Sequence, residues 1–144
     1  MIKTRALPGI FLLLLACSSV AYSQSLVEEF SFEIKDFKMD HQTQTNNLNI
    51  SISYRYIANI QKADYPDFRW LAKDVESLLS NYPNKDDYWE IVNKQITSML
   101  LNKYPAIVSV TSEIKVHPSN LIPYTRSSRV TRERTPSKST RTKQ

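Results

Sequence analysis

Residues 48–56, Leu-Asn-Ile-Ser-Ile-Ser-Tyr-Arg-Tyr, decide the fold class of this 144-residue chain, because apolar and polar side chains alternate strictly along them. Such alternation predicts a β-strand with one buried and one exposed face, since successive side chains of a strand point to opposite sides. The stretch therefore predicts a sheet that is covered on one face only. The buried row would hold Leu48, Ile50, Ile52, Tyr54 and Tyr56.

After this strand the apolar spacing changes to that of two amphipathic helices. The first is predicted as about four turns behind a start signal of Asp64, Pro66 and Asp67, and it ends at residues 81–83. The second is predicted over residues 84–104, with Asn84 as its N-cap. A proline follows each helix and ends it. The buried stripes are predicted to hold Phe68, Leu71, Ala72, Val75, Leu78, Leu79 and Tyr82 in the first helix, and Trp89, Val92, Ile96, Met99, Leu100 and Tyr104 in the second.

Three further stretches alternate like strands: residues 26–39, residues 108–116 and, more weakly, residues 124–131. In the first of them the phase shifts by one residue between Ile34 and Phe37, which indicates a β-bulge. In the second, Val108, Val110, Ile114 and Val116 would share the buried face.

Residues 40–47 contain no apolar side chain and predict the turn between the first two strands. Asn46 and Asn47 are expected to take the left-handed conformation that glycine usually supplies. The element order then predicts an α+β fold, ββααββ, with an antiparallel sheet and both helices on one face. The other face would be polar, and solvent, a wet barrel interior or a partner subunit could cover it.

Residues 1–23 read as a secretory signal peptide, because a basic start precedes a short apolar run at residues 10–16. Cleavage before Gln24 would release the mature chain. Alternatively, the run ending at Cys17 resembles a lipobox, which would leave Cys17 lipidated. Either route predicts an exported bacterial protein, in the periplasm, outside the cell or anchored to a membrane as a lipoprotein.

The sequence has one glycine, Gly9, and one cysteine, Cys17, and both lie in the predicted leader. Glycine-dependent motifs such as dinucleotide fingerprints, phosphate-binding loops and nucleophile elbows are therefore excluded from the rest of the chain. With two histidines and no other cysteine, neither a disulfide framework nor a Cys/His zinc site is expected. No metal and no cofactor is predicted.

Charge is concentrated near the end of the sequence. Residues 125–144 contain seven basic residues and one acidic residue, a net charge of +6, and the leader adds +2. Because the formal net charge of the whole sequence is +5, the remaining residues have a net charge of −3. We expect a single domain over residues 24–124, with a fourth strand reaching about 132, and a basic tail over residues 125–144. The tail could bind an anionic envelope surface or be a solvated, disordered end, and no nucleic acid is expected because no aromatic residue follows Tyr124.

The element order and spacing resemble the tunnelling fold, and within it the dihydroneopterin aldolases. Residues 64–68, Asp-Tyr-Pro-Asp-Phe, resemble the aldolase segment in which a catalytic tyrosine precedes the first helix. Residues 88–92, Tyr-Trp-Glu-Ile-Val, resemble the second-helix motif whose glutamate holds the pterin ring. Residues 114–123 resemble the segment that carries the catalytic lysine. The resemblance covers residues 48–123.

This resemblance implies Tyr65 and either His117 or Lys115 as catalytic candidates and Glu90 as the ligand-binding residue. His117 stands where the family has its lysine, and the family's glycine-containing loop is missing. A carboxylate can also accept two adjacent N–H groups of a purine or pterin, which supports Glu90 independently. Other interpretations remain: Glu90 could stabilise the helix dipole, Tyr65 could pack on the core, and His117 could be a polar strand end.

Two functions follow from these residues. The first, which we favour, is a non-catalytic module that keeps the fold for assembly as a homo-oligomer and binds a partner through its polar sheet face or basic tail. The second is binding or turnover of a pterin- or purine-like heterocycle anchored by Glu90, resembling dihydroneopterin aldolase, a lyase. Export, the missing glycine loop and the replaced lysine favour the first.

Overall fold

The structure, a computed structural model, describes residues 26–135. The predicted leader, including Cys17, and residues 136–144 of the predicted tail lie outside them. The elements are β1 (Glu29–His41), β2 (Gln44–Tyr56), the 3-10 turn η1 (Lys62–Asp64), α1 (Phe68–Ser80), α2 (Trp89–Lys103), β3 (Ile107–Val116) and β4 (Arg126–Glu133).

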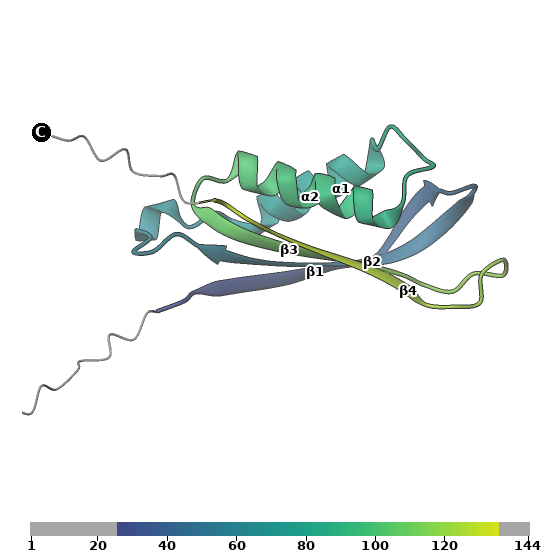
Figure 1. The fold of residues 1–144 in the computed structure, drawn as a ribbon, viewed down its shortest axis with the longest axis horizontal. Helices are drawn as coiled ribbons and strands as arrows, with labels where there is room; N and C mark the ends of the chain where they lie inside the picture. The colour runs from purple at the N-terminus through teal and green to yellow at the C-terminus, as the bar shows by residue number, and fades with distance from the viewer. Residues whose placement is uncertain (1–25, 136–144) are drawn as a thin grey trace, which may run out of the picture.

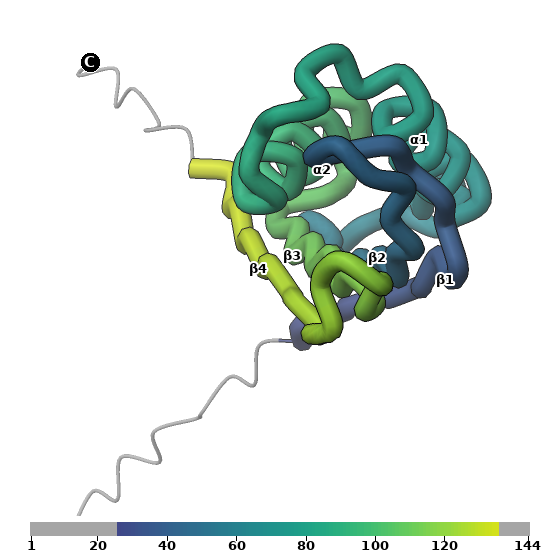
Figure 2. Tube along the Cα trace, turned by 90° about the vertical axis from the view of Figure 1, so that its right-hand side faces the viewer, coloured from purple at the N-terminus to yellow at the C-terminus, as the bar shows by residue number. Residues whose placement is uncertain are grey.

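The strands form one antiparallel sheet in the order β1-β2-β3-β4, and both helices cover the same face of it (Figure 1). The end-on view in Figure 2 shows the two layers, with the helices above the sheet and no element of residues 26–135 over its other face. The predicted α+β fold, ββααββ, is therefore confirmed. No helix within residues 26–135 combines the length and apolar character needed to cross a bilayer.

The core lies between the helices and the apolar face of β2 and β3. Leu48, Ile50, Ile52 and Tyr54 are buried as their alternation predicts, and Leu48, Ile50 and Tyr54 lie opposite buried residues of β3. The helices contribute Leu71, Val75, Leu79, Val92, Ile96 and Leu100.

One polar cluster interrupts this apolar layer. Asn93 of α2 accepts a hydrogen bond from the Ser112 hydroxyl (2.7 Å), and its amide donates to the carbonyl (2.8 Å) and hydroxyl (3.0 Å) oxygens of Ser128. All three residues are buried. The Asn93 side-chain oxygen has one hydrogen-bond partner and the nitrogen has two, so neither atom is buried without a partner. These hydrogen bonds connect α2 to β3 and β4.

The bulge in β1 is confirmed, because the pairing with β2 shifts between Ile34 and Phe37. Asp36 lies at the shift with a φ of 55°. Its backbone N–H donates to the Asn49 side-chain oxygen at 3.2 Å. The Asn47 amide donates to the Asp36 carboxylate at 3.1 Å, so two asparagines of β2 hold the bulge.

The turn predicted over residues 40–47 is wrong in extent. Both strands continue through this segment, and only Gln42 and Thr43 lie outside them, with φ of 52° and 66°. Asn46 and Asn47 lie in β2 and do not have positive φ. A residue far along the chain stabilises this tight turn, since the Gln42 N–H donates to the Lys85 carbonyl at 2.8 Å.

The start of α1 agrees with the predicted start signal, whereas α2 starts later than the sequence predicts. α1 begins at Phe68, and Asp67 caps it by accepting from the Arg69 N–H at 3.0 Å. α2 begins at Trp89 with no side-chain cap. Asn84 lies in the preceding loop, where its amide donates to the Asp87 carboxylate at 2.6 Å, so the predicted cap at Asn84 is wrong.

Two strand details also differ. A second register shift, between Arg55 and Tyr56, places Ile107 in the core, while the predicted core residue Val108 is half-buried. The fourth strand runs from Arg126 to Glu133 rather than over residues 124–131. Much of the basic stretch is therefore part of the sheet.

We expect Thr43→Gly to raise the free energy of unfolding by about 1 kcal/mol, because a β-branched residue at positive φ is strained and glycine is not. Urea denaturation measures the change. Ser51→Gly, at an exposed strand position, is the matched control and should lower stability by about 0.5–1 kcal/mol. Equal destabilisation by both variants would contradict the strain at Thr43.

Candidate functional site

Tyr65 follows η1 at the end of the sheet where β1 begins and β2 ends. Its ring packs edge-on against Tyr56, with centroids 4.8 Å apart, and its hydroxyl donates to the Glu28 carboxylate. The Glu28 hydrogen bond and partial desolvation raise the pKa of Tyr65 above the usual value for tyrosine. Tyr65 is 42% exposed, so it is not a core residue.

His117 and Lys115 lie at the other end of the sheet, on its polar face. His117 follows β3, and its Nε2 lies 3.1 Å from the Asn49 side-chain oxygen. Lys115 lies opposite Asn49 in the register. Asn49 and Tyr56, the β2 neighbours of His117 and Tyr65, are seven residues apart, or about 23 Å along an extended strand.

Glu90 lies in the first turn of α2, on the helix layer, and its side chain is exposed. Among residues 26–135, no lysine or arginine nitrogen lies within 4.0 Å of its carboxylate. One chain therefore places Tyr65, Glu90 and the His117–Lys115 pair in three separate regions. A site that uses all of them would need more than one chain.

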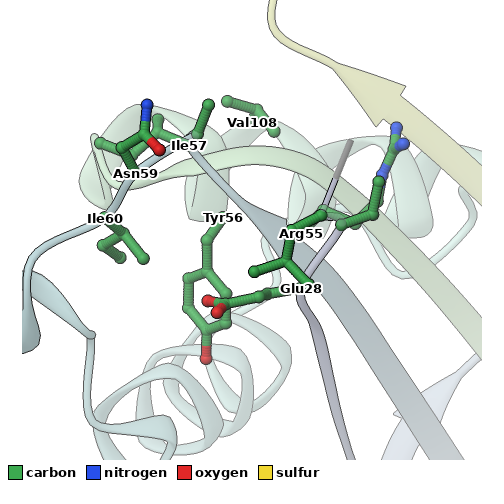
Figure 3. Close-up of a pocket in the computed structure, with 10 residues that line it drawn as sticks. Glu28, Arg55, Tyr56, Ile57, Asn59, Ile60 and Val108 are labelled. Atoms are coloured by element: carbon green, nitrogen blue, oxygen red, sulfur yellow. The ribbon is translucent and has the colours of Figure 1, made fainter. Parts of the chain in front are cut away.

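A cleft of about 690 Å³ opens beside Tyr65, where β1 begins, β2 ends and β3 begins. Figure 3 shows Ile57, Asn59 and Val108 on one side of it, and the Tyr56 ring and Glu28 on the other. Its walls are mostly apolar, with one carboxylate, Glu28, and one guanidinium, Arg55, which pairs with Glu133. The lining residues are Leu26, Val27, Glu28, Arg55, Tyr56, Ile57, Ala58, Asn59, Ile60 and Val108.

At the opposite end, the β1–β2 hairpin docks onto the loop between the helices. His41 is buried against the Trp89 ring, with centroids 4.5 Å apart, and its Nε2 lies 2.8 Å from the Asp87 carbonyl oxygen. The Asp87 carboxylate accepts from the Tyr82 hydroxyl at 2.7 Å. The burial of His41 could not be predicted from the sequence, because a histidine in a polar run gives no burial signal. Its contacts hold the hairpin in place.

The uncovered sheet face carries polar side chains along every strand. Arg55 of β2 pairs with Glu133 of β4 across the intervening strand, where Ser109 is buried. Arg129 pairs with Glu113 at 2.5 Å. No group of three histidine, cysteine, aspartate or glutamate side chains suited to a metal ion forms within the described part of the chain. The face is therefore a charged and hydroxylated surface and not a second core.

Comparison with models of protein families gives no match to this chain, and no curated protein matches it. The relation to the tunnelling fold remains a resemblance carried by residues 48–123 and by the element order.

We expect the free energy of unfolding to fall between about pH 10 and pH 12. Burial and the Asp87 hydrogen bond raise the pKa of Tyr82 from 10.0 to about 12, and similar causes raise those of Tyr54 and Tyr104. A pKa that is higher in the folded state gives stability that is complete below the unfolded pKa and is lost as pH rises through the folded one. Chemical denaturation at each pH measures the loss.

Tyr82→Phe is the matched variant for this pH dependence. It should make the loss of stability between pH 10 and pH 12 smaller than in the unchanged protein, because one of the tyrosine hydroxyls with a raised pKa is gone. An identical pH dependence in both proteins would contradict the assignment to Tyr82.

Proposed function

We propose that this protein is an exported, non-catalytic module that forms a homo-oligomer by pairing β4 of one copy with β1 of the next. The observation that carries the proposal is the opposite charge of the two edge strands. β1 contains four carboxylates and two lysines, whereas β4 contains three arginines and one glutamate. Opposite charges favour this contact and disfavour pairing of like edges.

The strand directions also suit this contact. Neighbouring strands are antiparallel throughout the order β1-β2-β3-β4, so β1 and β4 run in opposite directions. A β4 strand placed beside β1 of another copy therefore continues the antiparallel ladder. Each edge of the described sheet presents unpaired backbone N–H and C=O groups that such a ladder would use.

An exposed aromatic cluster lies along the β1 edge. Phe30 of β1 is 39% exposed and Phe68 of α1 is 43% exposed, with ring centroids 5.4 Å apart. Phe32 lies 6.2 Å from Phe68. A neighbouring copy that continues the sheet would cover part of these rings, which adds apolar burial to the charge attraction.

Such a contact uses different surfaces on the two copies, so repeated contacts form a closed ring or an open filament. The polar sheet face would then form a continuous surface for a further partner. Residues 136–144 follow β4 in the sequence and contain three cations and no carboxylate side chain, a composition that suits an anionic envelope surface.

The assembly proposal predicts that reversing either edge charge abolishes association. We expect the variant Arg129→Glu/Arg132→Glu, and separately the variant Glu29→Lys/Glu33→Lys, to shift the protein from oligomer to monomer. An equimolar mixture of the two variants should associate again, because each reversed edge then meets an oppositely charged one. Light scattering coupled to size-exclusion chromatography measures the mass.

Lys73→Glu/Lys94→Glu is the matched control for the arginine variant, since it makes the same charge change on the two helices. It should leave the mass unchanged. The proposal fails if the unchanged protein is a monomer at every concentration tested, or if the mixture of the two edge variants stays monomeric.

The alternative function is binding of a pterin- or purine-like heterocycle by Glu90. Its support is the exposed carboxylate at the start of α2, free to accept two N–H groups. It needs a second chain to bring Tyr65 or His117 nearby, and so depends on assembly.

Calorimetry with pterin, guanine, xanthine and urate tests the heterocycle proposal. If Glu90 anchors the ligand, Glu90→Gln should weaken binding by about 10- to 100-fold, because the charge-assisted bonds are lost. Glu76→Gln, an exposed glutamate on α1, is the control and should have no effect. Equal binding by all three proteins would exclude Glu90 as the anchor.

A further inference from the structure

The cleft beside Tyr65 contains a site suited to a cation. The Glu28 carboxylate lies next to the Tyr56 and Tyr65 rings, and the Tyr65 hydroxyl donates to it. Within residues 26–135, no lysine or arginine nitrogen lies within 4.0 Å of Glu28. A carboxylate beside two tyrosine rings attracts a guanidinium both by charge and by contact with the ring faces.

β4 ends beside this cleft. The Arg134 backbone N–H donates to the carbonyl of Val108, a lining residue, at 2.7 Å, and its guanidinium donates to the Leu101 carbonyl at 2.5 Å. Glu133 pairs with Arg55, another lining residue. Arg134 therefore fixes where the chain leaves the sheet, next to one wall of the cleft. Figure 1 shows the start of β1 and the end of β4 at the same end of the sheet.

The residues that follow have the complementary charge. Residues 136–144, Pro-Ser-Lys-Ser-Thr-Arg-Thr-Lys-Gln, contain three cations and no carboxylate side chain. β1 and β4 are separated by three strand spacings, or about 14 Å. An extended chain covers about 3.3 Å per residue, so Arg141, six residues beyond Thr135, can reach about 20 Å, whereas the backbone at Lys138 reaches about 10 Å. Lys143 lies further along and also has sufficient reach, so the shape of the side chain decides between the two cations. The planar guanidinium of Arg141 suits a site with aromatic rings and a carboxylate better than an ammonium group does.

We propose that residues 136–144 fold back across this cleft in the same chain and place the Arg141 guanidinium against Glu28, Tyr56 and Tyr65. The tail then covers the apolar walls of the cleft, which include Ile57 and Val108. This contact is independent of the edge pairing, because it forms within one copy.

Disulfide trapping tests the contact in the full chain. With Cys17→Ser, the sequence has no other cysteine, so Ala58→Cys on the cleft wall and Ser139→Cys in the tail form the only pair. We expect this pair to oxidise at least about tenfold faster than a control pair of Lys115→Cys and Ser139→Cys, because docking raises the local concentration of the thiols. The product should have the mass of a single chain and a rate independent of protein concentration.

Charge variants show whether Glu28 and Arg141 hold the tail. Arg141→Gln and Glu28→Gln should each slow the reaction toward the control rate, and the exchange Glu28→Arg/Arg141→Glu should restore part of it. Arg141 lies outside the described fold, so its variant tests the contact without altering the sheet. Trapping no faster than the control, trapping unaffected by Arg141→Gln, or disulfides only between chains would overturn the proposal. The intrachain disulfide measures the tail contact, whereas the oligomer mass measures the edge pairing, so each proposal can fail without the other.

Discussion

The antiparallel pairing of β2 with β3 is the interaction on which the rest of the structure depends. These strands are neighbours in the sheet, yet both helices lie between them in the sequence. Their apolar residues share one face, which is the face that the helices must cover. The hydrogen bonds of Asn93 to Ser112 and Ser128 fix the position of α2 along the sheet, because they form at one position only.

Local sequence patterns predicted the fold where burial alone decides the structure. The alternation along residues 48–56 gave the correct face of β2, and the phase change near Ile34 gave the bulge. The same patterns failed at the β1–β2 turn. Gln42 and Thr43 have no intrinsic preference for positive φ, and the contacts that hold them there come from Lys85 and Asp87, more than 40 residues away. A tertiary contact of this kind leaves no signal in the local sequence.

The candidate site shows a different limit of sequence analysis. Tyr65 and His117 each follow a strand, and the two strands are antiparallel neighbours, so their ends lie at opposite ends of the sheet. Topology alone therefore implied their separation within one chain. The arginines were harder to assign, because a run rich in Ser, Thr and Arg has the composition of a disordered tail. Pairing with β3 makes Arg126, Arg129 and Arg132 part of a sheet edge instead.

The two helices are held to the sheet unequally, and this has a consequence for the motions of the protein. α2 lies over β3 and β4 and is fixed by the Asn93 cluster, whereas the α1 backbone approaches only β1 and α2. Segments with fewer buried contacts open at lower free energy than the whole domain unfolds. Amide protons of α1 should therefore exchange with solvent before those of α2 and β3. Opening of α1 would expose the aromatic side of β1 while leaving the central strands intact.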